Sequence, residues 1–496
     1  MQTGMCHTPL AAAGVSNPHW LDVSNYCYLL LFLLIKKAPF LLTSISRSAK
    51  KHTCDGIGNP MVNISYKEDP HMKKSVTKLL AVTAALVTAA CCTVGAAQPE
   101  KSVAETETAS AAAVEIGTAD ELLAFAQSVT DGSAGGYAGQ TIVLTDDIDC
   151  SELAWQPIGT MDLNDMSNYS CMFQGTFDGQ GHTISNVTFS SDTPVCGVGI
   201  IGMNLGEVKN LNAENVRIKC TDTYSMAIGG IVGYNMGLIH DCVLDGENEI
   251  VGVNATGGIA GGSTGTVYNC SVDGTTIRVL GDNDFSDGRI IQCDVAECGG
   301  LIIGGSFGGT MDNCTARGTV IAEGNEPVGL GGIAGCLEMM DSVTNCSADV
   351  EIKSEKGGHA IGGLCGYSGT HSIGDVAAAT EGITTSEYPG IIDNCRVTVK
   401  MDIPGATHVG GLIGTGLYYY GEETAFKITD CSVSGEINGA VTPGAVAGRA
   451  ENSLIESCET EISLDGEPLT DKVGQTTTMY ESGDQFEEEA ETEEAA

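Results

Sequence analysis

Seven cysteines recur at one position of a repeated unit, each directly after an aspartate, an asparagine or, once, a serine. These cysteines are Cys242, Cys270, Cys314, Cys346, Cys395, Cys431 and Cys458. The residues before the first six are Asp241, Asn269, Asn313, Asn345, Asn394 and Asp430. A zinc site needs convergent thiolates, often as C-x₂₋₄-C pairs, and one cysteine per unit does not supply them. Because cysteine also packs as a small apolar residue, we interpret these thiols as core.

The unit that carries each cysteine begins with a glycine pair, as in GGIVGYNMGLIHDCVLDG from Gly229. Related units run from Gly199, where the cysteine is missing, to a decayed unit at Gly444. The spacing from Cys242 to Cys270 is 28 residues. Short β-branched runs separated by Gly, Asn and Asp fill it, which predicts three short strands and three turns. Such a unit is one coil of a β-helix.

The alternation of side chains predicts a corner inside each coil. An unbroken strand would point Ile239 and Cys242 to opposite faces, although both are apolar. The conflict disappears if Asp241 is a corner in the left-handed conformation, which Asn and Asp tolerate. We therefore expect a file of inward thiols beside a file of corner amides, about 4.8 Å apart from coil to coil. The glycines of GGxxG are interpreted as turn residues where coils stack closely.

Composition excludes several function classes. The chain has 66 Gly but only 10 Phe and 2 Trp, which is typical of a thin solenoid with many turns. Its net charge of −41 argues against nucleic-acid binding, because that function needs a basic surface. An acidic extracellular protein is the simplest interpretation. In an oxidising compartment, Cys150 with Cys171 or Cys293 with Cys298 are the candidate disulfide pairs.

A secretory signal pattern begins inside the chain, at Met72. A basic start, an apolar run and small residues follow one another in MKKSVTKLLAVTAALVTAACCTVGAA. We interpret 72–97 as a signal peptide and 1–71 as an upstream extension from a misassigned start codon. Alternatively, Cys91 closes a degenerate lipobox and is lipidated, which would anchor the protein to a membrane. Both interpretations place the protein outside the cytoplasm, either secreted or at the cell surface.

The remainder divides into a linker, a solenoid and a tail. Residues 98–115 are polar and of low complexity, and 467–496 are acidic and expected to be disordered. Between them, 116–466 form the β-helix. Thr118 and Glu121 have the spacing of a capping box, which predicts a helix over 119–129 that covers the N-terminal end of the solenoid.

Three insertions break the period, at Gly281–Glu297, Ser368–Gly390 and Thr415–Phe426. Solenoids often bind ligands through loops inserted on one face. The third insertion carries a tyrosine run that either contacts a ligand or packs over its own coil. This run is Tyr418, Tyr419 and Tyr420. In the first insertion, Asp282, Asn283, Asp284 and Asp287 offer oxygen ligands for calcium, although their spacing equally fits a solvated turn.

The repeats resemble the GLUG motif of bacterial surface and secreted proteins, through Gly411-Leu412-Ile413-Gly414 and Gly363-Leu364-Cys365-Gly366. The segment from Ala119 through Phe173–Gly179 is similar to the block that precedes such repeats. It is also similar to the β-helical part of the immunoglobulin-A1 metalloprotease family. The resemblance covers about 116–465 and implies an all-β fold, a right-handed, single-stranded parallel β-helix of pectate-lyase type. It implies little about activity, because function depends on sites rather than folds.

Catalytic motifs are scarce. The zinc-protease motif H-E-x-x-H is absent, since no histidine is followed by glutamate. A lyase or glycosidase needs paired carboxylates on the solenoid flank, and the outward candidates are Asp245, Asp273 and Glu351. A solvated acidic face explains these residues equally well. We favour a monomeric, non-catalytic protein without a cofactor that presents loops to an extracellular glycan, surface or protein. The alternative is a polysaccharide-processing enzyme.

Overall fold

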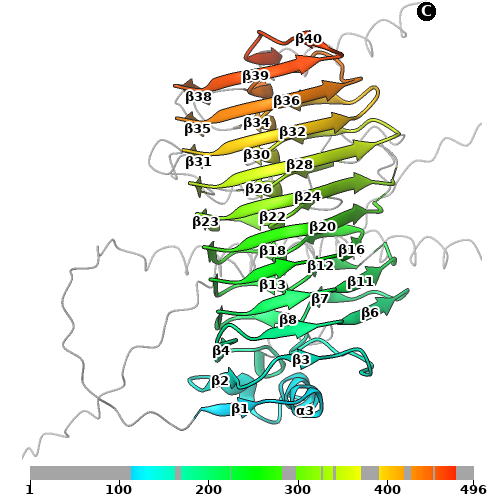
Figure 1. Cartoon of the computed structure of the whole chain (residues 1–496), viewed down its shortest axis with the longest axis vertical. Helices are drawn as coiled ribbons and strands as arrows, with labels where there is room; N and C mark the ends of the chain where they lie inside the picture. The colour runs from blue at the N-terminus through cyan, green and yellow to red at the C-terminus, as the bar shows by residue number, and fades with distance from the viewer. Residues whose placement is uncertain are drawn as a thin grey trace, which may run out of the picture. The chain divides into compact units, whose positions relative to one another are not determined.

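The computed structural model describes residues 113–161, 169–223, 225–281, 298–324, 328–338, 342–369, 390–417, 426–450 and 453–475. These residues form short strands stacked in parallel coils, with helix α3 (Ala119–Thr130) at the N-terminal end of the stack (Figure 1). This is the parallel β-helix that the sequence predicts. Within these ranges, no helix has the length and apolar character needed to cross a membrane.

Four sheets, here called A to D, run along the axis of the coils. Sheet A contains β1 (Val114–Ile116), β2 (Thr141–Leu144), β4 (Thr176–Asp178), β9 (Glu207–Lys209), β14 (Leu238–His240), β19 (Thr266–Tyr268), β23 (Thr310–Asp312), β27 (Ser342–Thr344), β31 (Gly390–Asp393), β35 (Phe426–Thr429) and β38 (Ser453–Glu456). Sheet B contains β3 (Ile148–Asp149), β5 (Thr183–Ser185), β6 (Thr188–Ser191), β10 (Asn212–Glu214), β11 (Arg217–Cys220), β15 (Val243–Asp245), β16 (Asn248–Gly252), β20 (Ser271–Val279), β24 (Thr315–Ala322), β28 (Ser347–Ser354), β32 (Arg396–Asp402), β36 (Ser432–Asn438), β39 (Glu459–Leu464) and β40 (Glu467–Pro468).

The other two sheets are made of short strands, many of which contain glycine. Sheet C contains β8 (Ile201–Asn204), β13 (Val232–Asn235), β18 (Ala260–Ser263), β22 (Ile303–Phe307), β26 (Ala334–Glu338), β30 (Cys365–Gly369), β34 (Ile413–Leu417), β37 (Ala447–Ala450) and β41 (Val473–Gln475). Sheet D contains β7 (Cys196–Val198), β12 (Met226–Gly229), β17 (Asn254–Gly257), β21 (Gly299–Gly300), β25 (Val328–Gly331), β29 (His359–Gly362) and β33 (Thr407–Gly410).

One coil visits the sheets in the order D, C, A and B, as β12, β13, β14 and β15 do. Each of these strands pairs in parallel with the equivalent strand of the next coil. The expectation of three strands per coil is therefore wrong. A bend at Gly230-Ile231 splits the expected strand into β12 and β13, which adds the fourth sheet.

The repeat glycines are required by close contacts more than by special turn angles. A β-carbon on Gly261 would lie 2.2 Å from the backbone nitrogen of Ile228 in the preceding coil. A β-carbon on Gly229 would lie 1.9 Å from the carbonyl oxygen of Val232. Neither glycine has a positive φ. The close stacking predicted from sequence is present, but its cause is backbone contact between sheets C and D rather than a left-handed turn.

Helix α3 covers the N-terminal end of the coils. The Thr118 hydroxyl accepts a hydrogen bond from the backbone N–H of Glu121 at 3.3 Å, as in a capping box. The Glu121 carboxylate accepts from the backbone N–H of Gly117 at 3.0 Å, and this bond lowers the pKa of Glu121. On the inner face, the Phe125 ring lies 6.1 Å from that of Phe173. Two 3₁₀ turns follow the helix in sequence, at Gly135–Tyr137 and Tyr169–Cys171.

Both predicted ends of the solenoid need correction. Strand β1 begins at Val114, inside the segment 98–115 assigned to the linker. Strands β40 and β41 lie in 467–475, which the sequence analysis assigns to the tail, and β41 pairs with β37 in sheet C. Strand β40 folds back on β39 in an antiparallel hairpin, whereas β1 and β41 each pair in parallel with a strand of an adjacent coil. The fold therefore extends at least from Val114 to Gln475.

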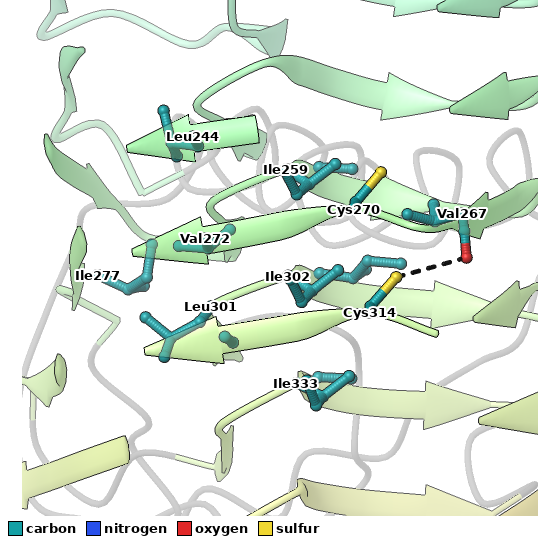
Figure 2. Close-up of a cluster of buried hydrophobic side chains, with 14 of the residues drawn as sticks. Leu244, Ile259, Val267, Cys270, Val272, Ile277, Leu301, Ile302, Cys314 and Ile333 are labelled. Carbon is teal, nitrogen blue, oxygen red and sulfur yellow. Dashed lines mark hydrogen bonds between the residues drawn. The ribbon is translucent and has the colours of Figure 1, made fainter. Parts of the chain in front are cut away.

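Two files of side chains fill the core between the sheets (Figure 2). Ile259 and Ile333 directly follow a glycine pair, and Ile302 takes the equivalent place after Leu301. The three side chains stack on one another with no solvent exposure. The repeat cysteines form the second file beside them. Cys150 and Cys171, a candidate disulfide pair, are buried free thiols.

Candidate functional site

The repeat cysteines lie together as a file of buried thiols. Six are at most 2% exposed, and Cys458, in the last coil, is half-buried. Each thiol donates a hydrogen bond to the carbonyl oxygen two residues earlier, at 3.1–3.5 Å. Cys314 also donates to the carbonyl of Val267 in the preceding coil, at 3.7 Å (Figure 2). The hydrogen bond with Cys395, together with burial, raises the pKa of Cys431.

The coil that lacks the cysteine shows what this position does. Leu211 follows the corner residue Asn210 and is fully buried in the same core. An apolar side chain can therefore take the place of the thiol. This substitution within the chain itself supports the interpretation of the cysteines as packing residues.

The corner residues adopt the left-handed conformation that their types predict. The φ angles are 53° at Asp241, 52° at Asn269 and 51° at Asn313. The later corners Asn345, Asn394, Asp430 and Ser457 have φ angles of 50–56°. Their side chains bond from coil to coil, with the Asn313 amide donating to the Asn269 carbonyl oxygen at 2.8 Å. These side-chain hydrogen bonds between adjacent corners help to hold the coils in register.

A charged cluster on the outer face of sheet A is a feature that the sequence analysis missed. The His240 ring contacts Asp241 through Nδ1 at 2.6 Å and Glu207 through Nε2 at 3.0 Å. It also stacks on Tyr268, with ring centroids 4.6 Å apart. Glu207 lies one coil earlier, where Leu238 pairs with it in β9. The parallel register of the coils, which was not known from the sequence, brings these residues together.

The cluster shifts the titration of its carboxylates. The hydrogen bond from His240 lowers the pKa of Asp241. Burial raises the pKa of Glu207, but hydrogen bonds from His240, Lys209 and Thr176 outweigh it and lower the pKa overall. Both ring nitrogens of His240 are engaged and its side chain is 12% exposed. The cluster therefore joins two adjacent coils through both ring nitrogens of His240.

We expect Asp241→Asn to keep the corner and lose only the ion pair, because asparagine occupies the same corner in other coils. The cost at neutral pH should be less than about 1 kcal/mol, since Asp241 is largely exposed. A carboxylate with a lowered pKa contributes stability above its ordinary value of 3.8, and this contribution disappears as pH falls through the lowered value. Urea unfolding of both proteins at neutral and acidic pH measures the difference.

The matched control is Asp430→Asn. Asp430 is a corner residue with the same backbone conformation as Asp241, but the residue before it is Thr429 instead of a histidine. This variant should differ little from the parent protein at either pH. A cost of Asp241→Asn that stays constant from neutral to acidic pH would contradict the ion-pair explanation.

The outer face of sheet B carries ladders of opposite charge. Arg317 and Asp273, on adjacent strands, form a two-pronged ion pair with both distances at 2.6 Å. Glu351 accepts from Lys353 at 2.7 Å and lies 3.5 Å from Lys400. Arg278 forms ion pairs with two carboxylates, Glu249 at 2.8 Å and Glu323 at 2.6 Å. Arg278, Arg317 and Lys400 thus pair with carboxylates of neighbouring coils, whereas Lys353 pairs with Glu351 on its own strand.

Two shallow grooves interrupt this face. The first, of about 570 Å³, lies where Arg278, Glu323, Lys353 and Asp402 meet near the ends of the long strands. The second, of about 600 Å³, crosses β28, β32, β36 and β39, and its polar lining consists of three serines, two threonines and four charged residues. Among the described residues, no group of three or more His, Cys, Asp or Glu side chains is arranged to hold a metal ion. The chemistry available at these grooves is polar binding.

Comparison with known proteins identifies the coil. Residues 405–438 match the GLUG motif. The match contains the glycine pair Gly410-Gly411, the bend after it and the corner Asp430-Cys431, so one GLUG motif corresponds to one coil. A solved structure similar to this chain is that of a proposed immunoglobulin A1 protease from Bacteroides ovatus. It is 18% identical with a TM-score of 0.37, over 75% of this chain and 86% of that chain. No curated protein sequence matches this chain.

Two of the insertions leave adjacent GLUG coils at the same corner. One connects β30 to β31 and the other connects β34 to β35, both between sheets C and A. The loop ends are paired, because Gly369 lies beside Leu417 and Gly390 lies beside Phe426. The insertion at Gly281–Glu297 instead connects β20 in sheet B to β21 in sheet D. The three insertions therefore do not all leave the solenoid at the same corner.

Several predicted site residues lie outside the described part of the chain. These are Cys91, the calcium candidates Asp282, Asn283, Asp284 and Asp287, and the tyrosines Tyr418, Tyr419 and Tyr420. The lipidation, calcium and tyrosine interpretations therefore stay predictions. The structure does describe the strands on either side of the tyrosine loop, β34 and β35.

Proposed function

We propose that this protein is secreted or displayed at the cell surface and binds an extracellular glycan or protein without turning it over. The signal pattern from Met72 and the net charge of −41 support the location. The binding role rests on the two loops between sheets C and A. We propose no cofactor, and contact with a membrane only if Cys91 is lipidated.

The observation that carries the binding proposal is the pairing of the loop ends. Gly369 with Leu417, and Gly390 with Phe426, are partners in two parallel sheets. Strands of this kind lie about 4.8 Å apart. The loops 370–389 and 418–425 therefore leave and rejoin the solenoid side by side, from positions held by several hydrogen-bonded coils. Rigidly held loop ends reduce the entropy lost on binding, which favours recognition.

An enzyme is the alternative, and the flank gives it little support. Two of the outward carboxylates on which it depends are ion-paired, Asp273 with Arg317 and Glu351 with Lys353. A glycosidase needs one carboxylate to donate a proton and another to act as base or nucleophile, and charge pairing hinders the first role. We therefore propose binding ahead of turnover.

We expect shortening of the tyrosine loop to abolish ligand binding while the fold survives. The variant replaces 418–425 by Met-Gly, the residues that connect β13 to β14 in a minimal coil. Affinity for the ligand found in a screen of glycans and host-cell proteins should fall about tenfold or more. Thermal unfolding should stay close to that of the parent protein, because the deleted residues lie between paired strands.

A matched control shortens 282–297, which connects sheets B and D at a different corner, and should leave the affinity unchanged. To test for turnover, the parent protein is incubated with pectin, alginate and host glycans, and the sugars released are measured. Sugar release would replace the binding-only proposal with the enzymatic alternative. Equal loss of binding in both loop variants would place the ligand elsewhere on the protein.

A further inference from the structure

The groove across β28, β32, β36 and β39 brings together charged side chains from three coils. Its four charged residues are Asp349, Arg396, Glu459 and Glu461. Within the ranges that the structure describes, none of these four side chains forms an ion pair, whereas Arg317, Arg278 and Lys353 on the same face all do. Unpaired charges around one hollow leave their interactions available to a ligand.

Strand register arranges these residues in two rows along the coil axis. One row reads Asp349, Thr398, Ser434 and Glu461, and the other reads Ser347, Arg396, Ser432 and Glu459. In the first row, two hydroxyl side chains stand between the charged ends Asp349 and Glu461, and the Thr398 and Ser434 hydroxyls lie 3.5 Å apart. In the second row, Arg396 stands between Ser347 and Ser432, and only Glu459 closes the row with a carboxylate.

The dimensions fit an extended chain. Asp349 and Glu461 are separated by three strand spacings, which is about 14 Å. Residues i and i+4 of an extended peptide point to the same side and are about 13–14 Å apart. Two cationic side chains at that spacing would reach both carboxylates at once. The peptide backbone between them would lie over hydroxyls that can donate and accept hydrogen bonds.

The net charge of the groove indicates which ligand charge it attracts. Three carboxylates and one guanidinium give the lining a net negative charge, within a chain whose net charge is −41. We propose that this groove binds an extended basic segment of a protein partner, with one cationic side chain at Asp349 and a second at Glu459 and Glu461. This site is separate from the loops at the C–A corner and does not depend on their role. The field of the whole protein would also speed the encounter with a basic partner.

The probe is a fluorescein-labelled peptide with two lysines four residues apart and threonines between them, titrated into the full chain and followed by anisotropy. We expect Glu459→Gln with Glu461→Gln to weaken binding about tenfold or more, because two carboxylates that meet one cation are removed. Arg396→Gln should strengthen binding, because it removes a like charge from the groove. A peptide with adjacent lysines should bind more weakly than the spaced one.

The matched control is Glu214→Gln with Asp245→Asn, which removes two exposed carboxylates that are neighbours on the same face of sheet B, outside both grooves. This pair should change the affinity less than twofold, since its only effect is on net charge. All variants are compared by thermal unfolding first. Equal weakening by the control pair would overturn the proposal in favour of unspecific attraction. Weaker binding of the spaced peptide to Arg396→Gln, or preference for an acidic peptide or an oligosaccharide, would overturn it as well.

Discussion

Replacing Gly261 by alanine is expected to lower the free energy of unfolding by about 3 kcal/mol or more. The added β-carbon would lie 2.2 Å from the backbone nitrogen of Ile228 and 2.3 Å from the carbonyl carbon of Ala227. Both atoms belong to the backbone of the preceding coil, so no rotamer change relieves the contact. Sheets C and D would have to separate locally, which loosens packing in both coils. Urea unfolding followed by far-UV circular dichroism measures the loss.

The control for Gly261→Ala is Gly466→Ala, in the turn between β39 and β40. Gly466 has a φ of +87° and open space around the position of a β-carbon. Its cost should be about 1–2 kcal/mol, from the left-handed backbone alone. If both variants lost the same stability, close contact between sheets would not be the reason for the repeat glycine. A parent-like Gly261→Ala protein would exclude the close packing altogether.

The sequence predicts the corner between sheets A and B because the residue types there have a known backbone preference. Asp241, Asn269 and Asn313 recur before an inward residue, and all three adopt a positive φ. The capping box of α3 was equally visible, since Thr118 and Glu121 are close in sequence. Local rules of this kind need no knowledge of the neighbouring coil.

A second left-handed position lies in sheet D and could not be predicted in this way. Ala227, Ala255 and Ala360 have φ angles of 59°, 50° and 54°. Alanine does not favour this conformation, so the packing of sheet D against sheet C must impose it. Each of these residues stands two places before a glycine pair. That recurrence of small residues was the available signal, and the sequence analysis assigned it no structure.

The candidate sites were hidden for a related reason. His240 and Glu207 are 33 residues apart, and the four charged residues of the groove come from three different coils. Their contacts depend on the register between coils, which the length of each insertion changes. Insertions also enter at different corners, and the sequence shows their length but not the corner. The binding surfaces of a solenoid therefore depend on which residues of adjacent coils are aligned. The structure of a single coil, in contrast, can be predicted from the sequence pattern inside that coil.

Replacing Cys314 by alanine is expected to cost about 1–2 kcal/mol, because it leaves a small cavity in a fully buried file. Serine should cost about 1–3 kcal/mol more. Its hydroxyl oxygen lies closer to the β-carbon than sulfur does, so it reaches the carbonyls of Asp312 and Val267 poorly. These acceptors are 3.5 Å and 3.7 Å from the sulfur. Urea unfolding of the parent and the two variants gives the order of stability.

If stability falls from the parent protein to Cys314→Ala and then to Cys314→Ser, Cys314 has a packing role rather than a chemical one. A thiol used for polar or metal chemistry would tolerate serine better than alanine, which is the reverse order. Alkylation with iodoacetamide, mapped by mass spectrometry, supplies an independent test. Half-buried Cys458 should react before the buried thiols of the file, and Cys314 should react only when the coils unfold. Rapid alkylation of Cys314 in the folded protein would contradict the closed core, and the file would then have to be considered a reactive site.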